Sequence, residues 1–181
     1  AFWGDTRADL HTSGHRYLLR RPQRAEDVIA IPVQDATLGS TASVSVAEKV
    51  ATHQPPRHFY DLLSPTGTPW YMYTITASGT TPAQRSMPVP VSAPSDGTGT
   101  LRVMLYGGND LPEGALPDHH VELLLNDQVV AAERFDGIAA RQYEIPVTNI
   151  VAGSNTVTVR LPADGGYSFD QVKVAKVELG Y

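Results

Sequence analysis

The stretch Leu123–Ala131, LLLNDQVVA, contains two β-type runs on either side of Asn126 and Asp127. Both turn residues tolerate the left-handed backbone conformation that a tight two-residue turn requires. The sequence therefore predicts an antiparallel hairpin here, with strands over Val121–Leu125 and Val129–Phe135.

The same kind of short run recurs along the chain, with apolar and polar residues alternating at the period of a β-strand. Fourteen prolines and fifteen glycines separate these runs, and no window of ten or more residues follows a helical period. About ten strands at this spacing predict an all-β, antiparallel two-sheet sandwich, jelly-roll-like or related. The other runs are Val28–Val33, Ala42–Ala51, Trp70–Thr76, Arg85–Val91, Thr100–Tyr106, Arg141–Val147, Asn155–Leu161 and Gln171–Leu179.

Two of these runs show which face should be buried. One face of Thr100–Tyr106 is apolar and the other is mixed, and Gln171–Leu179 nearly repeats that pattern. Each strand therefore offers one face to a shared core. The residues predicted to face it are Leu101, Val103, Leu105, Val172, Val174 and Val177.

Prolines inside strand-like runs predict where the sheets end. A proline lacks the N–H that a central strand donates, so it belongs on an edge strand, at a bulge or with its nitrogen turned outward. The prolines in question are Pro32, Pro88, Pro90 and Pro146.

The chain is long enough for one large domain. We expect residues 1–13 to be an N-terminal arm, in which Phe2 and Trp3 favour docking over disorder, and residues 14–181 to form a single sandwich. The stretch 92–99, SAPSDGTG, is the only plausible internal boundary, and we interpret it as a long loop within the domain.

Composition excludes several function classes. There is no cysteine, so disulfides, thiolate nucleophiles and cysteine zinc sites are excluded. The net charge is −5, and the only basic cluster is Arg20, Arg21 and Arg24, which argues against a nucleic-acid surface. No apolar run reaches the roughly 18 residues of a membrane span. We expect any export signal to lie outside this chain.

His119 and His120 are the most conspicuous titratable pair. Adjacent strand residues point to opposite faces, so the two rings should diverge rather than share an ion. We expect one to pack or hydrogen-bond at the strand start and the other to face solvent. No metal and no cofactor are predicted.

Catalytic patterns are missing from the sequence. There is no GxSxG serine elbow, and nothing marks two of the nineteen acidic residues as a catalytic pair. The loops Gly107–Asp110 and Asp164–Gly166 have oxygen donors for calcium but lack the alternating acidic pattern, so we interpret them as turns. We expect that the chain is not an enzyme.

The segment Thr68–Tyr73, TPWYMY, gathers three aromatic residues. Period-2 geometry predicts Tyr71 and Tyr73 on one face and Trp70 and Met72 on the other, with one face in the core. Aromatic faces are the usual platform for sugar rings, so the candidate ligand or interaction residues are Trp70, Tyr71, Tyr73 and Tyr167.

Three separate pieces carry a family resemblance: His15–Leu18 (HRYL), Phe59–Tyr73 (FYDLLSPTGTPWYMY) and a long third piece from Leu116 to Pro162. The third piece combines a Pro-Asp-His-His-Val start, an Asn-bearing hairpin, an aromatic-Asp-Gly and a Gly-x-Asn-Thr. Together they resemble the β-sandwich accessory domain of gingipain-like proteins, the bacterial peptidase family C25 of caspase-fold cysteine peptidases.

The resemblance implies a non-catalytic module beside a peptidase domain in an exported, surface-associated protein. The catalytic His and Cys of that family have no counterpart here, because the chain has no cysteine. We expect a module that supports or positions a neighbouring domain through an exposed apolar patch. The alternatives are a carbohydrate-binding module, whose partner would be a glycan or cell-surface component, and a self-standing hydrolase.

Overall fold

The computed structural model describes residues 48–56, 58–92, 94, 96–112 and 117–181, and these residues form eleven β-strands and no helix. The predicted all-β class is therefore confirmed. In chain order the strands are β1 (Val50–Thr52), β2 (Phe59–Tyr60), β3 (Trp70–Tyr71), β4 (Tyr73–Ser78), β5 (Ala83–Val91), β6 (Gly99–Gly107), β7 (His119–Leu125), β8 (Gln128–Phe135), β9 (Ala140–Val147), β10 (Gly153–Leu161) and β11 (Phe169–Gly180).

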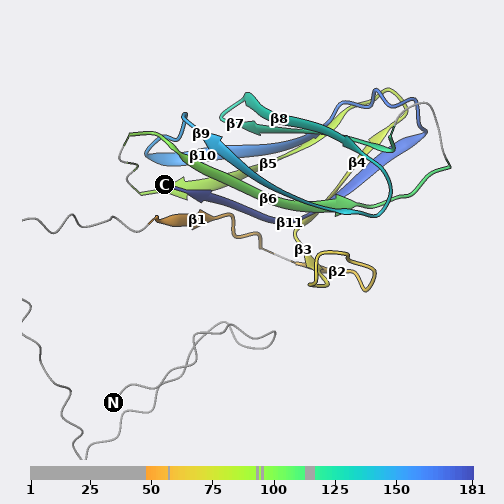
Figure 1. The fold of residues 1–181 in the computed structure, drawn as a ribbon, viewed down its shortest axis with the longest axis horizontal. Coiled ribbons are helices and arrows are strands. Elements are labelled where there is room, and N and C mark those ends of the chain that lie inside the picture. The colour runs from red at the N-terminus through yellow and green to blue at the C-terminus, as the bar shows by residue number, and fades with distance from the viewer. Residues whose placement is uncertain (1–47, 57, 93, 95, 113–116) are drawn as a thin grey trace, which may run out of the picture. The chain divides into compact units, whose positions relative to one another are not determined.

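Nine of these strands form two antiparallel sheets that lie face to face, as Figure 1 shows. The five-stranded sheet has the order β1-β11-β6-β9, and β4 pairs with the first half of β11. The four-stranded sheet has the order β5-β10-β7-β8. The predicted two-sheet sandwich is confirmed, and β2 and β3 form a separate small hairpin beside it.

The core between the sheets is built from the alternating residues that the sequence marks. Every residue predicted to face the core on β6 and β11 is at most 1% exposed. Burial of each such side chain contributes about 1.5–3 kcal/mol to folding. The four-stranded sheet contributes Met87, Val89, Val91, Val121, Leu123, Leu125, Val157, Val159 and Leu161.

A β-bulge explains why the apolar pattern of β11 only nearly repeats that of β6. The pairing register with β6 shifts between Val174 and Lys176, so Ala175 is an extra residue on this strand. After the bulge the core face continues at Val177 and Leu179, both fully buried.

Three of the four prolines inside strand-like runs are described, and all three lie on edge strands, one of the predicted placements. Pro88 and Pro90 are on β5, the edge of the four-stranded sheet, and Pro146 is on β9, the edge of the five-stranded sheet. Their missing N–H groups therefore interrupt no central ladder.

The predicted hairpin at Asn126 and Asp127 is also confirmed. Leu125 pairs with Gln128, and the two turn residues have φ angles of 49° and 66°. Positive φ at both central positions is the type I′ geometry whose twist matches that of the strands.

The stretch 92–99 connects β5 of one sheet to β6 of the other.

Some predictions lie outside the described residues: the arm 1–13 with Phe2 and Trp3, the first resemblance piece His15–Leu18, and the Val28–Val33 run with Pro32. Of the Ala42–Ala51 run only the end is described, and it belongs to β1. Among the residues that the structure describes, no helix is long and apolar enough to cross a membrane.

Candidate functional site

The hairpin of β2 and β3 is a compact loop held by its own backbone. The amide of Asp61 donates to the carbonyl of Pro69 at 2.8 Å, and the amide of Ser64 donates to the carbonyl of Asp61 at 3.2 Å. The Asp61 carboxylate accepts the amide of Leu63 at 2.9 Å, an Asx-type turn. Gly67, with φ of 76°, supplies the left-handed residue in the loop.

The aromatic residues of this hairpin lie in two cross-strand pairs. Phe59 stacks on Tyr71 with ring centroids 5.5 Å apart, and Tyr71 meets the ring of Tyr106 edge-on at 6.3 Å. Tyr60 and Trp70 form the other pair, edge to face at 5.0 Å. Since paired strand residues share a face, one pair faces the five-stranded sheet and the other faces outward.

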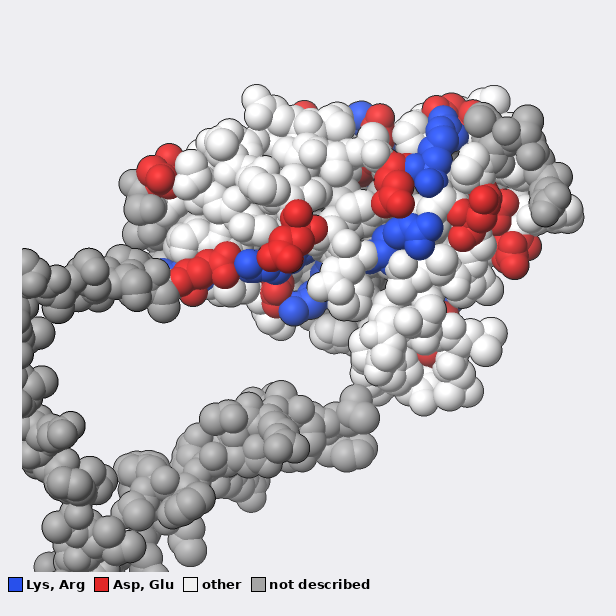
Figure 2. All heavy atoms as spheres, viewed as in Figure 1, with Lys and Arg blue, Asp and Glu red and all other residues white. Residues whose placement is uncertain are grey.

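Exposed apolar side chains gather on this hairpin. Leu62 and Leu63 are 80% and 76% exposed, and Phe59, Tyr60 and Trp70 are also exposed. Figure 2 shows the hairpin as a lobe below the sandwich with almost no charged side chain on it, whereas charges line the neighbouring sheet. We call these five residues the apolar hairpin surface. Exposed apolar side chains that gather in this way make the hairpin the candidate interaction surface of the described residues.

One ionic contact joins the hairpin to the sandwich. The Asp61 carboxylate forms an ion pair with the ammonium of Lys173 on β11 and accepts the hydroxyl of Tyr106 at 3.1 Å. The hydrogen bond from Lys173 lowers the pKa of Asp61, while burial and the nearby carboxylate raise the pKa of Tyr106. The Lys173 nitrogen also lies 5.3 Å from the centroid of the Tyr71 ring.

The structure separates the aromatic residues that the sequence grouped. Trp70 and Tyr71 are on the hairpin, but Tyr73 is on β4 opposite the core residue Val174. The prediction that Tyr71 and Tyr73 share a face is therefore wrong. The strand is interrupted at Met72, which is buried, and the period-2 rule holds only within an unbroken strand.

Tyr73 closes one side of the sandwich. Its hydroxyl lies 3.0 Å from Nε2 of His53, and the guanidinium of Arg85 covers its ring at 4.2 Å from the centroid. Nδ1 of His53 in turn lies 2.8 Å from the carbonyl of Pro88 on β5. Tyr73 is thus engaged in joining the two sheets.

The two histidines diverge, as predicted. His119 is fully buried, and its Nδ1 lies 2.7 Å from the carboxylate of Asp170. His120 is half-buried on the other face, where its Nδ1 lies 2.8 Å from the carboxylate of Asp164. Burial raises the pKa of Asp164, but hydrogen bonds from His120 and Arg134 outweigh it, and the net shift is downward.

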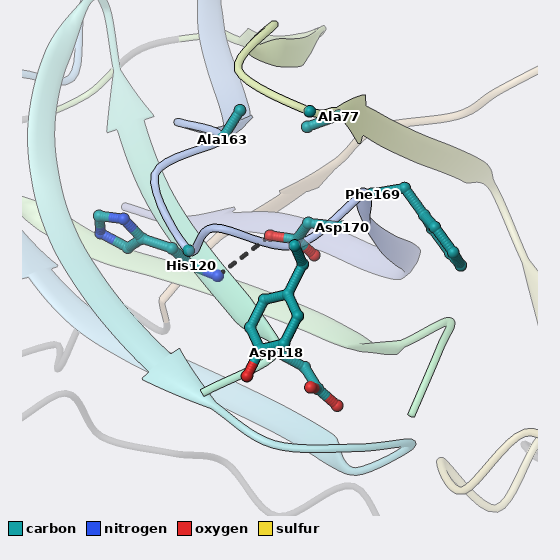
Figure 3. Close-up of a pocket in the computed structure, with 9 residues that line it drawn as sticks. Ala77, Asp118, His120, Ala163, Phe169 and Asp170 are labelled. Carbon is teal, nitrogen blue, oxygen red and sulfur yellow. Dashed lines mark hydrogen bonds between the residues drawn. The ribbon is translucent and has the colours of Figure 1, made fainter. Parts of the chain in front are cut away.

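Tyr167 lines a shallow pocket where β11 begins. Figure 3 shows the pocket, in which the backbone N–H of His120 donates to Asp170 and the imidazole points away from the other labelled side chains. The carboxylates of Asp118 and Asp170 that reach it are held by backbone amides or by His119. The lining residues are Ala77, Gly79, Asp118, His120, Ala163, Gly165, Tyr167, Phe169 and Asp170.

The loops considered for calcium are engaged in internal contacts. Asp164 binds His120 and Arg134, and the side-chain oxygen of Asn109 accepts the amide of Gln171 at 2.7 Å. Within the described ranges, no three His, Asp or Glu side chains converge in a way that could hold a metal ion.

Sequence reasoning found Trp70 and Tyr71 but missed the rest of the apolar hairpin surface and its ionic contact. A signal was present in Phe59–Leu63, FYDLL, where one acidic residue interrupts an apolar run. Its partner Lys173 is 112 residues away in sequence, and only the tertiary fold brings it close.

No family model and no curated protein matches the chain. Solved structures do match. Dimeric latent PorU from Porphyromonas gingivalis is 12% identical over 78% of this chain and 13% of its own length, with a TM-score of 0.52. The CBM36-1 domain of a multidomain xylanase from the hindgut metagenome of Trinervitermes trinervoides is 13% identical. That match covers 75% of this chain and 98% of the domain, with a TM-score of 0.44. A family 35 carbohydrate binding module from Clostridium thermocellum is 18% identical. That match covers 73% of this chain and 92% of the module, with a TM-score of 0.42. At 12% identity the match to PorU shows a shared fold and no more.

Proposed function

We propose that this chain is a non-catalytic accessory β-sandwich module of a larger exported or cell-surface protein, and that it supports or positions a neighbouring domain. The apolar hairpin surface is the contact. The observation that carries this proposal is the gathering of five exposed large apolar side chains on one small hairpin. Aromatic side chains are enriched in the buried core of a protein interface, and Lys, Glu and Asp side chains are depleted there.

The sequence supports the same proposal. The hairpin coincides with Phe59–Tyr73, one of the three pieces that resemble the accessory domain of gingipain-like proteins. The fold likeness to part of PorU, a protein of which this chain covers 13%, agrees with a module inside a longer polypeptide. The first partner is therefore another domain of the parent chain.

A photo-crosslinking experiment tests this proposal. p-Benzoylphenylalanine replaces Leu62 in the natural protein that contains this chain, expressed in its own host. The control replaces Val129, which is 52% exposed on β8, far from the hairpin in sequence. We expect crosslinks from position 62 into another domain of the same polypeptide, mapped by mass spectrometry. The proposal fails if position 62 crosslinks no more than position 129, or only to separate proteins.

A second candidate function is a carbohydrate-binding module. The observation that favours it is the outward-facing pair of Tyr60 and Trp70, since exposed aromatic rings stack on sugars. A glycan array probed with the 181-residue chain separates the two functions. Specific binding that Trp70→Ala or Tyr167→Ala removes would favour the carbohydrate-binding module, and a blank array from folded protein would favour domain docking.

A further inference from the structure

The β2–β3 hairpin has little backbone support from the sandwich. Each of its strands has two residues, and a two-stranded hairpin of that size is not stable alone in water. Within the described residues 58–71, no backbone hydrogen bond to either large sheet is found. The flanking bonds are His53 to Val177 and Met72 to Val174. Side chains must therefore fix the hairpin in place.

A single carboxylate connects the hairpin turn to two central strands. The Asp61 carboxylate accepts the amide of Leu63 within the turn, the hydroxyl of Tyr106 on β6 and the ammonium of Lys173 on β11. Tyr106 and Lys173 are register partners on the outer face of the five-stranded sheet. The side chains of Asp61 and Lys173 are largely shielded, at 16% and 19% exposed.

We infer that Asp61, Lys173 and Tyr106 are positioning residues for the apolar hairpin surface. They fix the orientation of the turn, so Leu62 and Leu63 are presented to a partner already ordered. Pre-ordering reduces the entropy cost of binding, which matters for a contact as small as this hairpin. The inference rests on the proposed function, because an ordered turn aids binding only if the apolar hairpin surface binds a partner. The anchoring of the hairpin itself can be measured without a partner.

Directional contacts are needed because the apolar contact alone does not set an orientation. The edge of Tyr71 on Tyr106 and its approach to Lys173 hold the ring near the sheet, yet such contacts tolerate sliding. Hydrogen bonds to a charged group have strict geometry and are the stronger kind. The carboxylate of Asp61 therefore defines where the turn lies.

Amide hydrogen exchange of the 181-residue chain tests the anchoring. The variants are Asp61→Asn and Lys173→Met, with Lys173→Arg as the conservative rescue. The matched control is Lys176→Met, which removes an ion pair with Glu178 on the same strand. We expect exchange in residues 59–71 to accelerate roughly tenfold or more in the two test variants and to stay unchanged in the control, with Lys173→Arg close to the original protein.

Two results would overturn the anchoring: unchanged hairpin exchange in both test variants, or acceleration that spreads equally over β6 and β11. The crosslinking yield from Leu62 then links anchoring to docking. A yield unchanged by Asp61→Asn would overturn the positioning role while leaving the proposed function intact. If the protein with the crosslinker at position 62 and Asp61 unchanged gives no crosslinks while its hairpin is anchored, the proposed function alone would be overturned.

Discussion

His119 lies fully buried at the start of β7, with an oxygen atom near each ring nitrogen. Nδ1 is 2.7 Å from the carboxylate of Asp170, and Nε2 is 3.2 Å from the carbonyl of Asn109. Both neighbouring atoms are oxygens that accept hydrogen bonds, so each ring nitrogen lies at a polar partner. The pair joins the start of β7, the start of β11 and the loop after β6, so a histidine that resembles a metal ligand in sequence serves as a structural connector.

Replacing His119 by leucine should lower the free energy of unfolding by about 3 kcal/mol, since the Asp170 carboxylate loses its buried partner. The double variant with Asp170→Asn should recover part of that loss. His120→Leu is the control, because it removes only a partly exposed pair and should cost less than about 1 kcal/mol. Urea unfolding measures all three, and equal losses for the two histidines would contradict this account.

Asn155, near the start of β10, is a second fully buried polar residue that joins separate parts of the chain. Its side chain is fully buried and hydrogen-bonds to both backbone groups of Val151 and to the amide of Asn126. Asn126 in turn accepts the backbone amide of Thr156 at 2.9 Å. Two asparagines thus connect the β7–β8 turn to the start of β10.

Asn155→Ala should destabilise the chain by about 1–2 kcal/mol, because it removes three partly buried hydrogen bonds, two to the backbone of Val151 and one to the side chain of Asn126. Ser154→Ala, at the exposed preceding position, should change stability by less than about 0.5 kcal/mol. Thermal unfolding followed by circular dichroism measures both. A loss at Ser154 as large as at Asn155 would show that the buried network is not the cause.

At the scale of elements, the β7–β8 turn carries a small cost. Asp127 has φ of 66°, a conformation that glycine adopts without a steric penalty. Type I′ turns accordingly prefer Asn-Gly over Asn-Asp. The chain retains the hairpin because the strands on both sides are well paired.

Asp127→Gly should stabilise the protein by about 0.5 kcal/mol, as relief of the left-handed strain exceeds the added chain entropy. Gln128→Gly, one residue later and inside β8, should instead destabilise it by about 0.5–1 kcal/mol. Denaturant midpoints of the two variants should move in opposite directions. A shift of both in the same direction would contradict the turn assignment.

The β2–β3 hairpin should respond to acid through the carboxylate of Asp61. The pKa of Asp61 in the folded chain lies below its ordinary value of 3.8, chiefly through Lys173. The anchor is therefore complete above that value and is lost as the pH falls through the lower, folded pKa. In neutral and mildly acidic solution the ion pair of Asp61 with Lys173 should therefore stay formed.

Trp70 can report this transition. The chain has two tryptophans, so Trp3→Phe leaves Trp70 on β3 as the single fluorophore. We expect the emission of Trp70 to change below pH 3.8, as the anchor is lost. Asp61→Asn should show that changed emission already at neutral pH. A change near pH 6, or the same acid transition in Asp61→Asn, would assign the response to other groups.

At the scale of the whole molecule, the two faces of the five-stranded sheet have different roles. The inner face is apolar and packs on the four-stranded sheet. The outer face carries charged pairs such as Arg102 with Glu48 and Glu144, and it ends at the hairpin anchored on Tyr106 and Lys173. The apolar hairpin surface thus lies beside the charged outer face of this sheet, on the side away from the core.

The sequence by itself determined the fold class, most strand positions, the turn at Asn126 and Asp127, and the divergence of the two histidines. It also limited Pro88, Pro90 and Pro146 to edge strands, bulges or positions with the nitrogen turned outward. These features depend on local chemistry: side-chain alternation, positive φ and the missing N–H of proline. Such rules act over a few residues and can be read directly from the chain.

Only the tertiary structure decided which aromatic residues form a surface. The break at Met72 sends Tyr71 to the outer face and Tyr73 to the core side, although the residues are two apart. Asp61 and Lys173 meet across 112 residues, and Asp170 reaches His119 across 51. Contacts between distant parts of the chain depend on sheet order and register, which the pattern of each separate strand does not contain.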